Sequence, residues 1–210
     1  GPLGQGLATA VGMALAEKLL SSRFGSNLVD HYTYVIAGDG CLQEGISHEA
    51  IEFSGHLKLS KLIVLWDDNK ISIDGSTGLS NSANQIGRFK AAGWHTQTID
   101  GHDHDQIEEA IINSKKSRKP SIIACKTTIG FGAPNLGGTS KTHGAPLGAD
   151  EIVATRKALG WSNKPFEIPE DILELWKKTT ERSQKIFEEW ENRFEQSSKK
   201  KRFKLFIDSE

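Results

Sequence analysis

The sequence predicts an α/β fold in which a parallel sheet carries helices on both faces, followed by a mostly helical C-terminal extension. Short runs rich in β-branched and aromatic residues alternate along the chain with segments of helical apolar spacing. The runs are residues 32–37, 61–66, 94–99 and 121–127, and the segments between them are residues 43–56, 83–92 and 105–114. This alternation is typical of a parallel sheet, because each strand needs a crossover, usually a helix, to reach the next parallel strand.

A further helix is expected before the first strand, over residues 7–20, with Gly25 just beyond its end. Its apolar residues recur at helical spacing and are Leu7, Val11, Ala14, Leu15 and Leu19. This pattern predicts a buried or half-buried helix.

The composition and the apolar periodicity of the chain change after the last predicted strand. Residues 129–148 are rich in glycine and have no apolar period, so we expect a long irregular loop, a kind of segment that is often functional or disordered. A helix is expected over residues 149–159. A long helix with one apolar stripe is expected from Ile172 to Phe194.

The last residues include a basic run, KKKRFK, from Lys199 to Lys204. One short run in a neutral chain is weak evidence for an anionic partner, so it is interpreted as a solvated linker or a helix end. We therefore divide the chain into an α/β domain over residues 1–148, a helical extension over 149–198 and a basic linker or tail over 199–210.

Composition excludes several classes of protein. The 210 residues carry 26 Lys and Arg against 27 Asp and Glu, so the net charge of −1 argues against nucleic acid as a partner. No run approaches the roughly 18 apolar residues of a membrane span, which predicts no membrane contact. The two cysteines, Cys41 and Cys125, make no disulfide framework, and reduced thiols favour a cytoplasmic protein.

Two polar clusters follow neighbouring strands of the predicted sheet. Gly38-Asp39-Gly40 comes after the first strand and Asp67-Asp68-Asn69 after the second. Ligands bind beyond the carboxyl ends of parallel strands, which is where both clusters fall. A carboxylate from Asp39, an amide oxygen from Asn69 and the main-chain carbonyl of Ile71 are donors that Mg²⁺ accepts from a protein. A helix beginning near Gln43 would point its amino end at phosphate groups that share the metal.

Each cluster alone is also common turn chemistry. The spacing favours the site: 28 residues separate Gly40 from Asn69, which is enough for a helix and a strand and places the clusters on successive parallel strands.

These motifs resemble the transketolase family. The segments that carry the resemblance are GPLGQG, GDGCLQEG, DDNKISIDG and THGAPLG, and it extends from Gly1 to about Gly160. The chain lacks an initiator methionine, and GPLG continues into a helix that resembles one in the family rather than a tag remnant. We therefore expect the chain to begin part-way through a thiamine-diphosphate-binding domain.

The resemblance implies the roles of individual residues. Asp39, Asn69 and the Ile71 carbonyl would hold Mg²⁺, with Ca²⁺ or Mn²⁺ as substitutes. Gly40 and Asn69 would contact the diphosphate of thiamine diphosphate, and the backbone of Gly1, Pro2 and Leu3 would lie along the cofactor.

Two further residues have roles that the resemblance implies. His143 would contact cofactor and sugar and would handle protons. Glu44 would be a buried glutamate near a subunit interface, relaying charge between two sites; alternatively, it is a carboxylate at a helix start, favoured by the helix dipole.

The implied activity is ketol transfer, the movement of a two-carbon unit from a ketose phosphate such as xylulose 5-phosphate to an aldose phosphate such as ribose 5-phosphate in the pentose phosphate pathway. A second subunit of a homodimer would supply the pyrimidine-binding domain. The chain alone is therefore expected not to turn over substrate, because half of a cofactor site cannot orient the ring.

Other interpretations stay open from the sequence. Dihydroxyacetone synthase and 1-deoxyxylulose-5-phosphate synthase share the GDG and asparagine motif, although THGAPLG and GPLGQG disfavour the second. A non-catalytic domain that kept the fold is another possibility. A nucleotide-binding oxidoreductase lacks support, since Gly4-Gln5-Gly6 is not followed by a third glycine at the required place.

Two other clusters have structural interpretations. His102-Asp103-His104-Asp105 is expected to be a turn, with Asp103 or Asp105 capping the next helix, rather than a metal site. Cys41 is expected to be a small packed residue at a helix start rather than a nucleophile.

Overall fold

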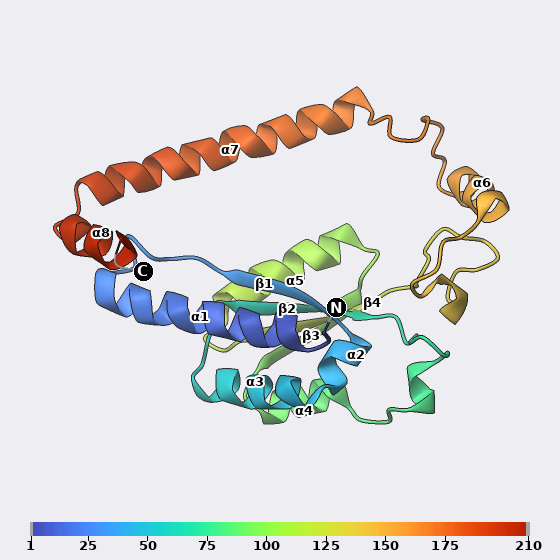
Figure 1. Cartoon of the computed structure of the whole chain (residues 1–210), viewed down its shortest axis with the longest axis horizontal. Coiled ribbons are helices and arrows are strands. Elements are labelled where there is room, and N and C mark those ends of the chain that lie inside the picture. Colours follow the sequence, from blue (N-terminus) through green and yellow to red (C-terminus); the bar gives the residue numbers. More distant parts are fainter. Residues whose placement is uncertain (1, 209–210) are drawn as a thin grey trace. The chain divides into compact units, whose positions relative to one another are not determined.

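A computed structural model of the chain describes residues 2–208. Its centre is a sheet of four parallel strands in the order β1-β2-β4-β3 (Figure 1). The strands are β1 (Thr33–Gly38), β2 (Leu62–Asp68), β3 (His95–Asp100) and β4 (Ser121–Lys126). All three strand pairs are parallel, so the predicted parallel sheet is confirmed.

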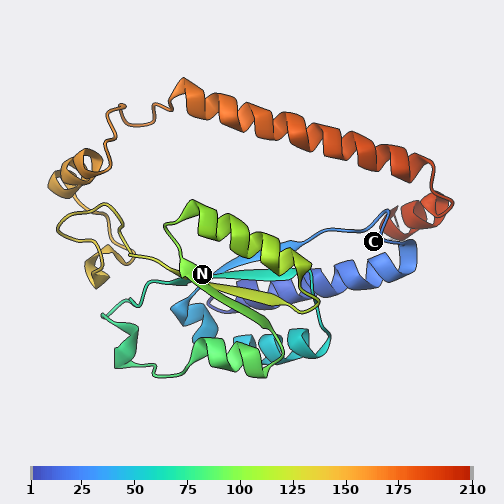
Figure 2. The same ribbon diagram turned by 180° about the vertical axis from the view of Figure 1, so that it is seen from behind.

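Helices cover both faces of the sheet, as predicted. Figures 1 and 2 show α3 (Gly45–His56) and α4 (Gln85–Ala91) on one side and α5 (His104–Lys116) on the other. The first face buries Leu62 and Val64 of β2 together with Ile51 and Phe89 of these helices. The first turns of α1 (Gln5–Phe24) pack there too. The opposite face buries Ile63 and Ile123 against Ala110 of α5.

This division follows from the alternation of side chains along a strand. Ile63 faces α5, whereas Leu62 and Val64 face the other helices, and all three are fully buried. Full burial of one such side chain contributes about 1.5–3 kcal/mol. Trp94 completes the first face, because its indole N–H donates to the Ile51 carbonyl at 2.9 Å.

The helix expected over residues 43–56 is interrupted, which corrects the sequence prediction. A short helix, α2 (Asp39–Gln43), begins directly after β1, and α3 starts at Gly45. Glu44 between them has an extended backbone, with φ −63° and ψ 143°. The amino end expected near Gln43 therefore lies at Asp39 for α2 and at Gly45 for α3. Asp39 and Gly40, expected in a turn, form the start of α2.

The segment after β4 is irregular, as expected, apart from one 3₁₀ turn, η2 (Ser140–Thr142). It leads into α6 (Ala149–Ala158). Another 3₁₀ turn, η1 (Thr77–Leu79), lies between β2 and α4. The C-terminal helices are α7 (Glu170–Glu195) and α8 (Lys200–Asp208), so most of the basic run Lys199–Lys204 is helical.

The chain divides into two compact units. One contains residues up to Ala16 together with His31–Gly160, and the other contains Glu17–Asp30 and Trp161–Glu210. The domain boundaries expected at residues 148 and 198 stay predictions.

The second unit has a core of its own. Phe24 packs edge-on against Phe203 at 5.0 Å between ring centroids. Trp190 and Phe194 stack at 5.2 Å, and the Trp190 indole N–H donates to the Leu28 carbonyl at 2.9 Å. Most of the rest of the expected α7 stripe is exposed: Leu175, Trp176, Ile186 and Phe187 are each at least half exposed. Leu19 of α1, expected in a buried stripe, is also exposed.

Candidate functional site

The two polar clusters meet at the carboxyl edge of the sheet. Gly38, the last residue of β1, is paired in register with Asp67 of β2, and Asp67 is paired with Cys125 of β4. Three strand ends therefore align. Asp39 and Asn69 leave this edge from adjacent strands, as the spacing predicted.

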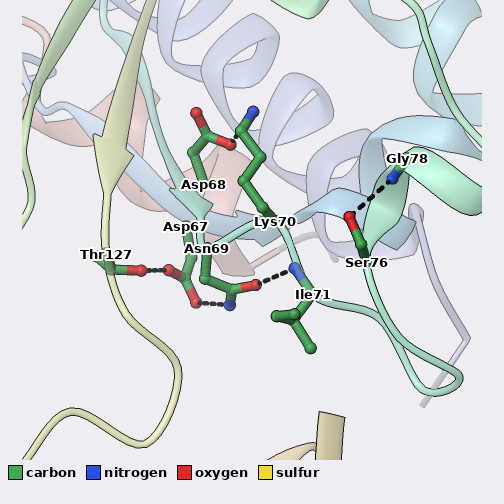
Figure 3. Close-up of polar contacts among 8 residues, drawn as sticks. All are labelled: Asp67, Asp68, Asn69, Lys70, Ile71, Ser76, Gly78 and Thr127. Carbon is green, nitrogen blue, oxygen red and sulfur yellow. Dashed lines mark hydrogen bonds and ion pairs between the residues drawn. The ribbon is translucent and has the colours of Figure 1, made fainter. Parts of the chain in front are cut away.

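A chain of hydrogen bonds orders the end of β2 (Figure 3). The Asn69 side-chain amide donates from Nδ2 to Oδ2 of Asp67 at 3.0 Å. Its Oδ1 accepts from the backbone N–H of Ile71 at 2.9 Å. The other oxygen of Asp67, Oδ1, accepts from the hydroxyl of Thr127, which follows β4. Asn69 and Ile71 are thus brought together, and their connection is a local Asx turn.

Asp39 contributes a buried oxygen without a hydrogen-bond partner, Oδ2. Burial and, next, the nearby Asp68 carboxylate raise the pKa of Asp39 to about 6, although Lys70 and the indole N–H of Trp66 act in the opposite direction. Asp39 lines a polar cavity of about 330 Å³ with Asp68, Lys70 and Lys126. A buried carboxylate oxygen that lacks a donor is well suited to a cation.

Lys70 is held in an uncommon conformation between the metal-site candidates Asn69 and Ile71. Its φ of 63° lies in the left-handed region, which non-glycine residues rarely adopt. Its ammonium group pairs with Asp68 at 2.6 Å (Figure 3) and lies 5.2 Å from the ring centre of Trp66. Left-handed backbone at a ligand edge is typical of functional sites.

The candidate donors are of the chemical type that a hard divalent cation takes. Asp39 offers an unpaired carboxylate oxygen, the Asn69 oxygen keeps one lone pair beyond the bond to Ile71, and the Ile71 backbone supplies a carbonyl. Within residues 2–208, no three His, Cys, Asp or Glu side chains gather into an alternative metal centre. Positive charge beside Asp39 would also offset the burial and the repulsion from Asp68 that together raise its pKa.

Comparison with known proteins gives the family. The model of the family described as transketolase, thiamine diphosphate binding domain, matches residues 1–205. The chain belongs to this transketolase family. The segment-based resemblance is therefore confirmed, and it extends further along the chain than expected.

Individual relatives agree with this transketolase assignment. The chain is 57% identical over 207 residues to a transketolase of Sinorhizobium medicae, covering 99% of the chain and 30% of that protein. It is 56% identical over 197 residues to a transketolase of Cereibacter sphaeroides, with 94% and 30% covered. The chain thus spans about a third of the length of these relatives.

A solved structure is similar over nearly the whole chain. The crystal structure of transketolase from Campylobacter jejuni matches with a TM-score of 0.95 at 42% identity, covering 97% of the chain and 32% of the crystallised chain. Transketolase from Leishmania mexicana matches with a TM-score of 0.89 at 41% identity, with 92% and 30% covered. The transketolase relationship therefore holds for sequence and fold alike.

The first of the transketolase motifs, GPLGQG, also lies against the candidate site. A Cβ built on Gly40 would lie 3.2 Å from Cδ1 of Leu3, so Leu3 packs directly against the GDG segment. Pro2 and Leu3 are exposed, which leaves them accessible to a ligand. Gly1 lies outside the described residues, and its expected contact with the cofactor stays a prediction.

Glu44 and His143 are not brought into contact with the cluster at the end of β2. Glu44 is exposed at the junction of α2 and α3, so the described chain does not bury it. His143 is exposed at the end of η2. The roles that the transketolase resemblance implies for these residues stay predictions.

The structure confirms the helix cap expected at Asp103 and the packing expected of Cys41. Asp103 caps α5, accepting from the backbone N–H groups of Asp105 at 3.0 Å and Gln106 at 3.1 Å. His102 accepts from the backbone N–H of Thr128 at 2.9 Å, so it ties a turn to the end of β4. Cys41 is partly buried against the first core face.

Sequence reasoning did not assign roles to Asp67 and Thr127. Asp67 was visible as part of the Asp-Asp-Asn cluster, but nothing local distinguished it from Asp68. Thr127 is 60 residues away along the chain and joins the cluster only because β2 and β4 are neighbours.

No helix within residues 2–208 has the length and apolar character needed to cross a bilayer.

Proposed function

We propose that this chain supplies the diphosphate- and metal-binding part of a transketolase. In the complete enzyme, a two-carbon ketol unit would pass from a ketose phosphate such as xylulose 5-phosphate to an aldose phosphate such as ribose 5-phosphate. This is a reaction of the pentose phosphate pathway, and we place it in the cytoplasm. A second, identical subunit would supply the pyrimidine-binding domain.

The observation that carries the proposal is the unpartnered, buried Oδ2 of Asp39 at the same sheet edge as the ordered Asn69 amide. Asp39, Asn69 and the Ile71 carbonyl would hold Mg²⁺, and Ca²⁺ or Mn²⁺ could replace it. Gly40 lets the chain approach the diphosphate closely, because it has no side chain there. When bound, thiamine diphosphate supplies the carbanion chemistry that ketol transfer needs.

The remaining residues would orient the cofactor and move protons. The backbone of Pro2 and Leu3, with Gly1, would lie along the cofactor. His143 is exposed on its loop, where an imidazole can exchange protons near neutral pH and contact the sugar. Glu44, exposed on this chain, would become buried against the second subunit and relay charge between the two sites.

Calorimetric titration of thiamine diphosphate into a full-length protein containing this chain, with and without Mg²⁺, tests the proposal. Because each change removes a direct metal ligand, Asp39→Ala and Asn69→Ala should each weaken Mg²⁺-dependent binding by about 100-fold or more. Asp74→Asn, which changes an exposed carboxylate in the following loop, should bind normally. Binding that ignores Mg²⁺, or survives both alanine changes, would contradict the metal assignment.

A further inference from the structure

We propose that Asp67 and Thr127 are positioning residues, which fix the side-chain amide of Asn69 so that its oxygen is the atom available to the metal. Neither residue is among the ligands proposed above. The inference rests on the proposed function for the identity of the cation. The orienting contact itself is a property of this chain alone.

The hydrogen bonds settle which end of the Asn69 amide is oxygen. Nδ2 faces a carboxylate oxygen of Asp67, which can only accept, and Oδ1 faces the Ile71 N–H, which can only donate. A flipped amide would place oxygen against oxygen at Asp67 and N–H against N–H at Ile71. Asp67 therefore opposes the orientation that would present a nitrogen to a cation.

Thr127 holds Asp67 in turn. Its hydroxyl donates to Oδ1 of Asp67, which leaves Oδ2 for Asn69 (Figure 3). Thr127 directly follows β4, so the contact ties together the ends of two strands that are adjacent in the sheet but not in sequence.

A nearby glycine leaves room for this threonine. A Cβ built on Gly101, just after β3, would lie 2.5 Å from the methyl carbon Cγ2 of Thr127. Any side chain at Gly101 would therefore push Thr127 out of position. The methyl group is packed on one side and the hydroxyl is bonded on the other.

This arrangement lies at the ligand-facing edge of the sheet. Asp67, Asn69 and Thr127 belong to none of the hydrophobic core clusters, and all three are only partly buried. These hydrogen bonds contribute nothing to the hydrophobic core, yet they restrain the side-chain amide of Asn69 at both its nitrogen and its oxygen. They are therefore suited to holding this candidate ligand ready for metal binding.

The first test uses metal-free protein. The Asn69 side-chain N–H₂ signals in a two-dimensional NMR spectrum, identified by their loss in Asn69→Asp, report on the contact directly. In Thr127→Val, which removes the hydroxyl but keeps the shape, these signals should shift and their exchange with water should quicken about 2- to 10-fold. Thr127→Ser should restore them, and Thr128→Val, at the exposed neighbouring threonine, should leave them unchanged.

A second measurement connects the contact to the metal. Mn²⁺ affinity of the full-length protein in the presence of thiamine diphosphate, followed by electron paramagnetic resonance, should fall about 2- to 10-fold in Thr127→Val and recover in Thr127→Ser. Asp67→Asn, which loses the charge but keeps the shape, should weaken Mn²⁺ binding as well. It also serves as a second variant if Thr127→Val does not fold.

The outcomes separate the two proposals. Unchanged Asn69 signals in Thr127→Val and Asp67→Asn would overturn the positioning role. Altered Asn69 signals with unchanged Mn²⁺ affinity would overturn the connection between this positioning contact and metal binding. If the unmodified protein bound no Mn²⁺, the proposed function would fail while the NMR result still decided whether Asp67 and Thr127 orient Asn69.

Discussion

Gly4 packs tightly against the junction of α2 and α3, close to the candidate site. It is buried with φ of 77°, and a Cβ there would lie 2.8 Å from Cγ2 of Ile46 and 2.9 Å from Cβ of Glu44. The chain before α1 therefore packs against the junction of α2 and α3. Leu3, directly before Gly4, lies beside Gly40.

Replacing Gly4 should be costly for two reasons, the left-handed backbone and the missing space. We expect Gly4→Ala to lower the free energy of unfolding by about 1–3 kcal/mol, measured by urea denaturation. Gly6→Ala is the matched control, because no atom lies within 4 Å of its built Cβ and alanine favours a helix. Equal stability of the two variants would contradict this account of Gly4.

At the scale of elements, the loop between β4 and α6 is held by Glu151 in the first turn of α6. Its carboxylate accepts from the backbone N–H groups of Asn135 at 2.8 Å and Leu136 at 3.0 Å, and from the Asn135 side chain at 2.8 Å. These hydrogen bonds, that of the Asn135 side chain foremost, lower the pKa of Glu151 below its ordinary value of 4.5. The loop that carries His143 is thus anchored despite its lack of regular structure.

The anchor should depend on pH in a defined direction. A carboxyl whose pKa is lowered by folding stabilises the fold above its ordinary value, and this contribution is lost as the pH falls through the lower, folded pKa. We expect the backbone amide NMR signals of Asn135 and Leu136 to titrate with a midpoint below 4.5. Glu151→Gln should abolish that titration, whereas Asp150→Asn, in the same helical turn but exposed, should preserve it. Signals that do not respond to pH would disprove the anchor.

At the scale of the whole molecule, each of the two compact units has its own apolar core. The second unit joins residues of the α1 end to the C-terminal helices, and Phe24 is its most buried aromatic side chain, at 1% exposure. Phe203 and Phe206 of α8 both pack on it. Most of the basic run thus lies in a helix that carries an apolar face.

Phe24→Ala should destabilise the second unit by about 3–5 kcal/mol, because it removes a buried ring and leaves a cavity. Hydrogen exchange of the α8 backbone amides, with urea unfolding, measures the effect. Phe166→Ala, which removes an exposed ring from the same unit, should change stability by no more than about 0.5 kcal/mol. Comparable losses in both variants would argue against the Phe24 cluster as the core of this unit.

Much of this protein was predictable because the signals are local. Strands, helices and the Asp103 cap follow from residue spacing and from the hydrogen-bonding chemistry of neighbours in sequence. The meeting of Asp39 and Asn69 at one edge follows as well, since parallel strands present their carboxyl ends on the same side. The motif segments also identify the transketolase family.

The tertiary structure alone decided the rest. Nothing near Thr127 indicates that it bonds to Asp67, because that contact depends on the strand order β1-β2-β4-β3. Likewise, nothing near Glu44 indicates that Gly4, 40 residues earlier in the chain, packs against it. Apolar periodicity reports which face of an element is buried, whereas these features depend on which distant segment packs there, and only the folded chain determines that.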